Sequence, residues 1–591
     1  INLIDWKEWF EEVSVVEQIL SKDPSGYYKK GDFQTRDSCR HVIELIAKKS
    51  SLSEVEIANN VIAYAEQKKV ELSQTNEEDR LFFKKRTHVG YYLVGEGLKE
   101  FEVFLNYKPP LYTSLKRWMR KRAFPLYALG VLILTFSFLF YLGIHLNSVS
   151  PGIFASIIIS LFFVIPASDL AISFVQWIVT HLVRPDFLSK LDFSEGIPEE
   201  CRTAVVVQTI LNDKTAVKNS LEVLEIRYLS NNMKNAVFGL LADFSDADSE
   251  SLHGDKEVMQ YAQEMVSSLC KRHNSNVFFV LFRRRQWNEA QRKFMGWERK
   301  RGKIEEFNSL IVENSENSFY LNEDLRKLLD GVVYVVTLDN DSQLPHGSLH
   351  KLVGTIAHPL NAPLISQRGD DLSLPVITEG YSIIQPRVGV SLISATASRF
   401  ARLFSGHAGL DPYTQTVSEV YQDLFSEGSF VGKGIYHARA FHSALQRRVP
   451  ENSILSHDLF EGCFARVALA TDIELFEDFS TKYHVHARRQ HRWVRGDWQL
   501  LPWIFFRVPD NKYKYYTTCL SSLARWKILD NLRRSLLAPS LYFYFLSLVV
   551  FLNNIDAVLF LLGVLVIAFP VYANVAQAFL IPPRGLSLEG H

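Results

Sequence analysis

Four long apolar segments dominate the pattern of hydrophobic and polar positions along this chain. They occupy residues 126–146, 151–167, 535–552 and 557–580, and short polar tips join them in two pairs. A run of about 20 apolar residues matches the hydrocarbon core of a bilayer, which is about 30 Å thick. We therefore predict two membrane-spanning helical hairpins rather than buried helices of a soluble protein.

The second of these segments carries polar residues near its end. Pro166 and Asp169 interrupt the apolar run, and residues 170–183 are mostly apolar again. Two interpretations remain open: residues 170–183 continue the span, or they form an amphipathic segment at the membrane surface.

Basic residues precede both predicted hairpins. Residues 116–122 read KRWMRKR, and Arg525, Lys527, Arg533 and Arg534 come before the second hairpin, whereas neither tip contains Lys or Arg. The positive-inside rule assigns such flanks to the cytoplasmic side. We therefore predict that the N-terminal region and the long middle segment both face the cytosol.

Residues 1–115 are polar and have helical periodicity. The letters SLSE at residues 51–54 form a capping-box pattern in front of an apolar stripe. No catalytic constellation is visible in this part of the sequence. We interpret it as a cytosolic helical domain with a regulatory or docking role, and a purely structural collar is the alternative.

Short apolar runs alternate with helical stretches between the hairpins. Residues 203–207, 236–241, 277–281 and 332–338 have the composition of buried strands. Buried strands with intervening helices are typical of a mostly parallel α/β sheet, whose ligands bind at the carboxyl ends of the strands. The predicted domains are an N-terminal helical domain (1–115), a first hairpin (116–189), an α/β domain (190–530) and a second hairpin (531–591).

The run that ends in TLDND holds the most informative residues. Asp339 and Asp341 are two positions apart at the end of a predicted strand, so their side chains project from one face. Hard Mg²⁺ or Mn²⁺ prefers such oxygen ligands and retains coordination sites for a diphosphate. We predict a metal site at Asp339 and Asp341, although many D-x-D patterns are only solvated turns.

Two further stretches are candidates for nucleotide binding. Asp243 follows the second predicted strand, where its carboxylate is placed to bind a base or a ribose; a solvated acidic loop is the alternative. Residues 297–303 read WERKRGK, and cations near a carboxylate–metal site stabilise a departing diphosphate. Arg299, Lys300 and Lys303 are thus candidate donor-binding residues, and a basic helix surface is the competing interpretation.

The sequences SHD at 456–458 and RWVRGDWQ at 492–499 complete the candidate site. Asp458 opens a helical stretch, where a carboxylate serves either as a general base or as a helix N-cap. Trp493 offers an aromatic face for a sugar ring, and Arg492 offers a cation for a diphosphate. A core tryptophan with an ion-paired arginine is the alternative.

Composition narrows the class of protein. Lys plus Arg and Asp plus Glu both number 65, so the charge gives no reason to expect a nucleic-acid partner. The five cysteines are scattered without a C-x-x-C pair, which fits a reducing compartment and argues against a zinc module. Because the chain starts at Ile1 rather than Met and ends soon after an apolar segment, we expect it to be a piece of a longer protein. No signal peptide is visible at residue 1.

The order of these motifs resembles that of processive inverting glycosyltransferases such as cellulose and hyaluronan synthases. Those enzymes carry D, D-x-D, T-E-D and Q-x-x-R-W in a GT-A fold, which the resemblance implies for the α/β domain here. Two departures stand out in this chain: SHD replaces T-E-D, and Arg489 stands where the last motif has Gln, with Gln490 one position later.

Longer stretches resemble the glycosyltransferase portion of bacterial cyclic β-1,2-glucan synthases. They lie at residues 32–37, 88–92, 294–303, 385–388, 427–436 and 489–499, and so are spread over most of the chain. The resemblance implies UDP-glucose as donor, a growing β-1,2-glucan as product, and an inner-membrane location. It also implies further cyclisation and phosphorylase portions of the same polypeptide.

The resemblance also implies roles for the candidate residues. Asp339 and Asp341 would hold Mg²⁺ or Mn²⁺, Asp243 the uridine end, and Asp458 the proton of the acceptor hydroxyl. Glycines and a proline at 406–412 predict a mobile loop, and Tyr413 beyond them is a candidate acceptor for priming, with Tyr421 as a rival. Two alternatives for the whole chain are a linear β-glucan synthase of another linkage and a non-catalytic polysaccharide-assembly scaffold.

Overall fold

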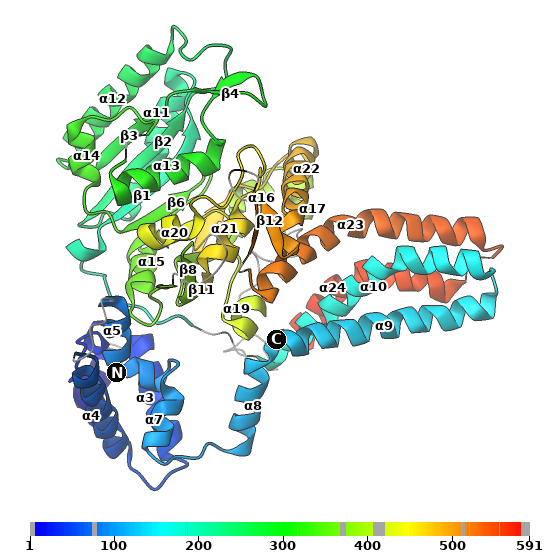
Figure 1. Cartoon of the computed structure of the whole chain (residues 1–591), viewed down its shortest axis with the longest axis horizontal. Coiled ribbons are helices and arrows are strands. Elements are labelled where there is room, and N and C mark those ends of the chain that lie inside the picture. Colours follow the sequence, from blue (N-terminus) through cyan, green and yellow to red (C-terminus); the bar gives the residue numbers. More distant parts are fainter. Residues whose placement is uncertain are drawn as a thin grey trace.

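The computed structural model contains a helical N-terminal part, an α/β domain, and a bundle of long helices that projects away from both (Figure 1). It describes residues 6–580 apart from 74–79, 184, 186, 316, 367–373, 406–419, 510, 511, 513, 519 and 555. The three parts follow one another along the chain except that the bundle takes helices from before and after the α/β domain.

A seven-stranded sheet forms the centre of the α/β domain. Its strand order is β11-β9-β10-β6-β1-β2-β3, with parallel pairing except on both sides of β10. The four predicted strands and the mostly parallel sheet are confirmed. The bounds are β1 Thr203–Ile210, β2 Ala236–Asp243, β3 Phe278–Phe282, β6 Tyr334–Leu338, β9 Ile383–Val390, β10 Gly434–His437 and β11 Val467–Glu477.

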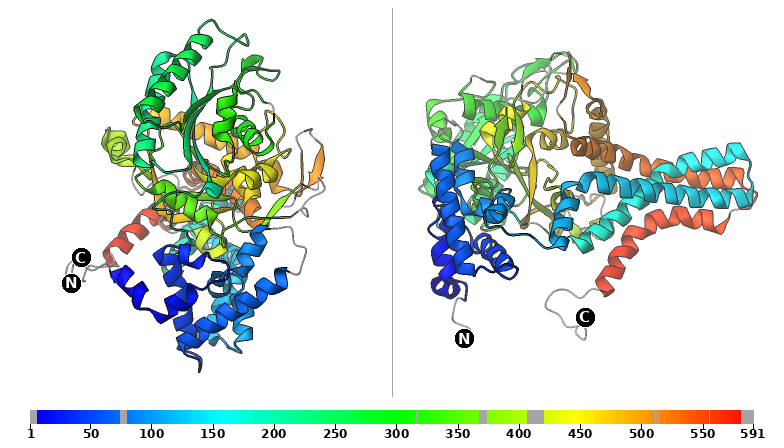
Figure 2. Two further views of the ribbon diagram at one scale, coloured as in Figure 1. Left: turned by 90° about the vertical axis from the view of Figure 1, so that its left-hand side faces the viewer. Right: turned by 60° about the horizontal axis from the view of Figure 1, so that its bottom comes forward.

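Helices cover both faces of this sheet (Figure 2). Successive strand residues alternate between two cores: Val205 and Val207 belong to one, Ala204 and Val206 to the other. The first core is closed by α11 Lys214–Ser230, α12 Asp255–Arg272 and α15 Ser348–Ala357. The second is closed by α13 Arg299–Glu313, α14 Glu323–Leu329 and α20 Ala438–Leu445.

The sheet topology gathers several chain segments at one edge. Val207 is level with Leu338, and Ile210 with Asp243, so β1, β2 and β6 end together. Because β10 runs antiparallel to β6, it begins at this same edge, and β9 and β11 end there. Residues that follow β2, β6 and β11, or that precede β10, therefore lie along the same edge of the sheet.

The long helices are α9 Ala123–Val149, α10 Ile153–Leu182, α23 Ser522–Phe551 and α24 Ala557–Leu580. Within the described residues, α9, α10 and α23 are long and apolar enough to cross a membrane, and α24 holds a shorter apolar stretch, Ala557–Ala573. Three of the four predicted spans thus have the length and apolar composition of a membrane-crossing helix, and the fourth corresponds to α24. Residues 170–182 belong to α10, so the interpretation that they continue the second helical segment is confirmed.

The polar residue inside the second span has a partner. Asp169 on α10 accepts a hydrogen bond from the Arg533 guanidinium on α23, with Nη1 and Oδ1 2.8 Å apart. A charged group between apolar helices is stable only when it is paired. The pair joins the two hairpins. Since α23 starts at Ser522, the predicted domain boundary at 530/531 falls inside this helix.

The N-terminal part has a core of its own and contacts the α/β domain. The start of α4 differs from the prediction: the capping box is Ser53 with Glu56, two residues later than residues 51–54, because Ser53 and Glu56 cap each other's backbone amides. The helices are α1 Trp6–Val13, α2 Val15–Leu20, η1 Tyr28–Lys30, α3 Phe33–Ala47, α4 Glu54–Ser73, α5 Arg80–Thr87, α6 Val89–Leu93, α7 Leu98–Phe104 and α8 Leu111–Lys121.

Two motifs of this part form its contact with the α/β domain. Asp32 caps α3, and its backbone amide donates to the Lys190 carbonyl. The buried ring of His88 lies 5.4 Å from that of His358. The remaining short elements are η2 Glu199–Cys201, β4 Gln286–Asn288, β5 Lys293–Met295, β7 Leu364–Ser366, β8 Val376–Glu379, α16 Leu392–Thr396, α17 Arg399–Phe404, α19 Val420–Phe425, α21 Asp458–Ala465, α22 Tyr483–Gln499, η3 Leu501–Ile504, β12 Arg507–Pro509 and β13 Tyr515–Thr517.

Candidate functional site

The D-x-D turn at the end of β6 is held by a buried arginine. The Arg227 guanidinium on α11 donates to the backbone carbonyls of Asp339, Asn340 and Ser342 at 2.6–3.1 Å. These bonds turn the chain so that both aspartate side chains leave the sheet edge. Burial lowers the pKa of Arg227 to about 10, although Asp341 and Asp339 act in the opposite direction. A lone arginine on a helix gave no signal in the sequence.

A third carboxylate joins the two aspartates. Glu477 is the last residue of β11, and the neighbouring Phe476 pairs with Gln343 just after the turn. Asp339, Asp341 and Glu477 each offer a carboxylate oxygen, and these atoms lie within 4.8 Å of one another. Oxygen donors at this spacing suit Mg²⁺ or Mn²⁺. Glu477 was not predicted, because no sequence pattern indicated β11.

Three cations surround these carboxylates. The Lys300 ammonium lies 3.0 Å from Asp339 Oδ1, the Lys433 ammonium lies 3.2 Å from Asp339 Oδ2 and also binds Glu477, and Arg489 lies 3.7 Å from Asp341. We call these six residues the open cluster, because the Asp339 side chain is 33% exposed. Burial opposes ionisation of Asp339, but Lys300 and Lys433 outweigh it and hold the pKa of that carboxyl well below its usual range.

Arg489 is the residue that departs from the Q-x-x-R-W motif. Its guanidinium carries a positive charge to Asp341, where an amide would carry none. The position at which the sequence departs from the Q-x-x-R-W motif is therefore part of the open cluster.

A strained turn aims Lys300 at the D-x-D carboxylates. Glu298 and Arg299 both adopt left-handed backbone angles, with φ of 48° and 49°. Such angles cost about 1–3 kcal/mol for each residue other than glycine. The turn starts α13, which places Lys300 on the side of Asp339 and leaves Arg299 on the surface with Asp246, 2.8 Å away.

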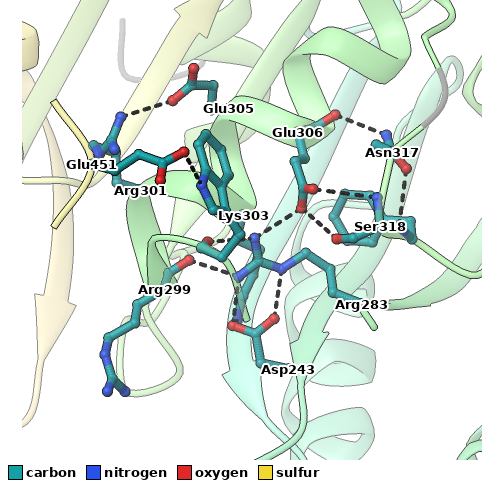
Figure 3. A network of polar contacts seen from close by, with 12 residues as sticks. Asp243, Arg283, Arg299, Arg301, Lys303, Glu305, Glu306, Asn317, Ser318 and Glu451 are labelled. Carbon is teal, nitrogen blue, oxygen red and sulfur yellow. Dashed lines mark hydrogen bonds and ion pairs between the residues drawn. The ribbon is translucent and has the colours of Figure 1, made fainter. Parts of the chain in front are cut away.

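Asp243 lies at the carboxyl end of β2, as predicted, but in a different environment. Both of its oxygens bind Arg283, at 2.7 and 2.9 Å, and Lys303 lies 3.0 Å from Oδ2. Arg283 also reaches Glu306, so that it lies between two carboxylates (Figure 3). We call Asp243, Arg283, Lys303 and Glu306 the closed cluster, since Asp243, Arg283 and Lys303 are buried.

The closed cluster shifts the titration of its members. Burial opposes ionisation of Asp243, but Lys303 and Arg283 outweigh it and lower the pKa of the carboxyl. Burial lowers the pKa of Lys303 to about 8, although Asp243 acts in the opposite direction. The three basic residues predicted to bind the donor therefore lie in different places. Lys300 lies beside the D-x-D carboxylates, whereas Arg299 pairs with Asp246 and Lys303 with Asp243.

Asp458 is the first residue of α21, next to a buried histidine. The N-cap is His457 without a side-chain cap bond, so the structure does not support the N-cap role for Asp458. His457 Nδ1 lies 2.7 Å from Glu461 Oε1 and 3.6 Å from Asp458 Oδ1. Burial opposes protonation of His457, but Glu461 and Asp458 outweigh it and raise the pKa of the imidazole.

The Asp458 side chain fits against a glycine. Gly432 has φ of +81°, and a Cβ at that position would lie 2.6 Å from Asp458 Oδ1. The adjacent Lys433 belongs to the open cluster, so the 431–433 loop connects Asp458 with the D-x-D carboxylates. Asp458 and Asp339 both raise the pKa of Lys300 against the effect of burial.

Helix α22 carries the R-W motif and packs against the Asp458 loop. A Cβ at Gly496 would lie 2.3 Å from the Ser456 side chain, and Gln499 accepts a hydrogen bond from the Leu455 amide at 2.7 Å. Arg492 and Trp493 lie exposed on this helix, and the Trp493 ring is 45% exposed. The same helix therefore presents Arg489 to Asp341 and leaves Trp493 open to solvent.

Of the two tyrosines proposed for priming, Tyr413 lies outside the described residues. Tyr421 is buried, and its hydroxyl lies 3.5 Å from Asp530 on α23.

Fold and site together define a protein with membrane-crossing helices and an α/β domain whose sheet edge presents carboxylates, cations and an exposed tryptophan. The chain is 40% identical over 541 residues to a protein described as cyclic beta-(1,2)-glucan synthase NdvB, from Rhizobium meliloti (strain 1021). The match covers 91% of this chain and 18% of that protein, so the chain spans about a fifth of the relative's length. No protein-family model matches the chain. The predicted resemblance to a portion of a cyclic β-1,2-glucan synthase is thus confirmed.

Proposed function

We propose that this chain is a membrane-bound inverting glucosyltransferase that transfers glucose from UDP-glucose to a growing β-1,2-glucan. The observation that carries the proposal is the open cluster: three carboxylates and three cations at the carboxyl edge of the sheet, connected to Asp458 through the 431–433 loop. The similarity to a protein named as a β-1,2-glucan synthase supports the choice of sugar and linkage.

The residues of the open cluster fit a divalent cation. Asp339, Asp341 and Glu477 provide oxygen ligands, and Lys300, Lys433 and Arg489 balance their formal charge. A bound Mg²⁺ or Mn²⁺ would therefore make the site net positive, which favours the negatively charged diphosphate of the donor. When bound, such an ion supplies Lewis-acid stabilisation of the leaving diphosphate.

Asp458 acts as the general base in this proposal. It takes the proton from the acceptor 2-hydroxyl while that oxygen bonds to the anomeric carbon of glucose. The bond from that carbon to the diphosphate breaks on the opposite side, and UDP leaves with the electron pair. One displacement converts the α-linked donor into a β-linkage. His457 contacts both Asp458 and Glu461, and this contact positions the base in the proposal.

The remaining site residues bind the two substrates. Trp493 presents an exposed ring on which the acceptor sugar stacks, and Arg492 and Lys300 balance charge on the departing diphosphate. Asp243 contacts the uridine end, for which its carboxylate retains lone pairs beside Arg283 and Lys303. Arg299 and Lys303 complete the donor side in the proposal, although they contact Asp246 and Asp243 rather than the open cluster.

The location and the partners belong to the same proposal. The basic flanks of the hairpins favour an inner (cytoplasmic) membrane with the α/β domain facing the cytosolic pool of UDP-glucose. Cyclisation and phosphorylase domains would belong to the rest of a longer polypeptide. Priming on Tyr413 is part of the proposal, and intact-mass measurement after incubation with UDP-glucose should show hexose increments that disappear in Tyr413→Phe.

The decisive experiment supplies purified protein with UDP-glucose and divalent metal. We expect UDP release and a product in which linkage analysis finds 1,2-linked glucose. Asp341→Ala should abolish UDP release, whereas Asp246→Ala, which removes an equal charge outside the open cluster, should retain it. Another linkage would favour the linear-synthase alternative, and absence of UDP release from the wild type would favour a scaffold.

A further inference from the structure

Helix α8 separates apolar and basic residues more sharply than its neighbours do. Its apolar residues recur at helical spacing along one side, and its basic residues occupy the other side. The apolar residues are Leu111, Tyr112, Leu115, Trp118 and Met119, and the basic residues are Lys116, Arg117, Arg120 and Lys121. All 11 residues are described, and none of them is buried. A helix of this kind needs an apolar partner outside the protein.

The basic side of α8 faces the N-terminal domain. Arg117 forms two hydrogen bonds with the buried carboxylate of Glu102 on α7, at 2.5 and 2.7 Å. This pair fixes the rotation of α8 about its axis. The apolar side chains consequently face away from the protein, and they are 47–90% exposed.

The position of α8 relates it to the membrane. The chain leaves the α-helical conformation at Arg122 and enters α9 at Ala123, where the first membrane-crossing helix begins. Figure 1 shows α8 running across the direction of α9, beside the end of the bundle nearest the α/β domain. Its axis therefore follows the membrane plane at the surface on which the α/β domain stands.

The basic residues around α8 indicate which kind of lipid this helix would bind. Lys116, Arg120, Lys121 and Arg122 lie toward the end of α8 that adjoins α9, and Lys99 from α7 lies close enough to interact with Lys121. Burial lowers the pKa of Lys99, and the like charges of Lys121 and Arg117 lower it further. Arg122 also lies 4.9 Å from the Trp118 ring, as is common for aromatic anchors at membrane interfaces.

We infer that α8 is an interfacial helix that inserts Leu111, Leu115 and Trp118 between acyl chains and binds anionic phospholipid headgroups through its cations. Apolar burial and attraction to anionic lipid strengthen each other in such helices. Through the Arg117–Glu102 pair, the inferred contact attaches the N-terminal domain to the bilayer. The inference depends on the membrane-crossing helices and is independent of the proposed glucosyl transfer.

The test uses tryptophan quenching in the reconstituted full chain. The emission of Trp118 is obtained as the difference between the wild type and Trp118→Phe, in vesicles of phosphatidylcholine with either brominated phosphatidylcholine or brominated phosphatidylglycerol. We expect quenching of this difference emission by both brominated lipids, and more by phosphatidylglycerol at equal mole fraction. The double variant Arg120→Gln, Lys121→Gln should lose the preference for phosphatidylglycerol while retaining quenching by brominated lipid.

The matched control is Trp287→Phe. Trp287 lies on β4, which Figure 1 shows at the end of the α/β domain far from α8, and is exposed to nearly the same degree as Trp118, 50% against 47%. Its difference emission should be quenched by aqueous iodide and be insensitive to brominated lipid. Iodide quenching of Trp118 without lipid quenching would overturn the inference, as would protection from both quenchers, which would indicate a protein partner. Equal quenching by the two lipids would overturn the anionic preference.

Discussion

The open and closed clusters contain the same kinds of side chain at the same edge of one sheet, yet we expect them to have different roles. Asp339 follows β6 and Asp243 ends β2, and each carboxylate is paired with two cations. The Asp243 side chain is 10% exposed, with Arg283 and Lys303 almost inaccessible, whereas the Asp339 side chain is 33% exposed. Solvent access, rather than ion pairing, therefore distinguishes the two carboxylates: Asp339 is more open to a ligand, whereas Asp243 is largely enclosed by its two cations and contributes more to the stability of the fold.

Removal of divalent metal should have the largest effect, and it should act through the open cluster alone. Two carboxylates that face a diphosphate repel it strongly without a cation. EDTA should abolish turnover of UDP-glucose, and Mg²⁺ or Mn²⁺ in excess should restore it. Titration of Mn²⁺ binding should fail in Asp341→Ala and be retained in Asp246→Ala. Full turnover in chelator would remove the metal role from Asp339 and Asp341.

Replacement of the proposed base should come next in size. Asp458→Asn preserves the shape of the side chain but cannot take a proton, so turnover should fall by about 10²–10⁴-fold. UDP binding, measured by calorimetry in the presence of metal, should remain unchanged because the open cluster is intact. Retention of more than about 10% of the activity would discard Asp458 as the base, since general bases contribute at least ~10²-fold.

The closed cluster should contribute more than the open cluster to the stability of the protein, which is the reverse of their expected contributions to activity. Asp243→Asn leaves Lys303 buried without a countercharge and leaves Arg283 with Glu306 alone, and breaking a buried pair in this way costs about 3–5 kcal/mol. Asp339→Asn removes a partly exposed carboxylate, for which ion pairs contribute ~0–1 kcal/mol. Thermal unfolding of both variants, followed by tryptophan fluorescence, should show a large loss for Asp243→Asn only. Equal losses would contradict the distinction between the clusters.

Acid titration sharpens the comparison by a smaller effect. The pKa of Asp243 is below its ordinary value of 3.8 in the folded protein, so its stabilising contribution is present above that pH. The contribution is lost as the pH falls toward the lower folded pKa. Unfolding temperatures measured from pH 6 to pH 3 should therefore decline less steeply in Asp243→Asn than in the wild type. Parallel curves would show that the carboxylate carries no such contribution.

The sequence predicted those parts of the fold that repeat a strong pattern. The strands β1, β2, β3 and β6 are runs of buried residues, and they were predicted at nearly their observed bounds. The strands β9, β10 and β11 were not, because β9 contains Pro386 and Arg387 and β10 is four residues long. Pairing with neighbouring strands, which no local pattern reveals, stabilises them.

The same limit applies to the site. Asp339, Asp341, Lys300 and Asp458 were predicted from motifs; the structure brings the first three together and places Asp458 against Gly432, next to Lys433 of the same cluster. Glu477 and Lys433 were missed because they depend on β11 and β10, and Arg227 and Arg283 because single arginines far apart in sequence carry no pattern. Their roles arise from the order of strands in the sheet, which places distant segments at one edge.

Helix α22 is attached to a membrane-crossing helix as well as to the Asp458 loop. The Trp498 indole on α22 donates to Ser535 on α23 at 3.0 Å, and Asn531 on α23 donates to Asp497 on α22 at 3.2 Å. The tilt of a membrane-crossing helix depends on the thickness of the bilayer around it. Because α22 also carries Arg489 and Trp493, we expect a change in that tilt to displace the proposed acceptor platform relative to Asp458, and turnover in vesicles of different acyl length tests this expectation. In the proposed mechanism, two hydrogen bonds would thus make membrane thickness a variable of the reaction geometry.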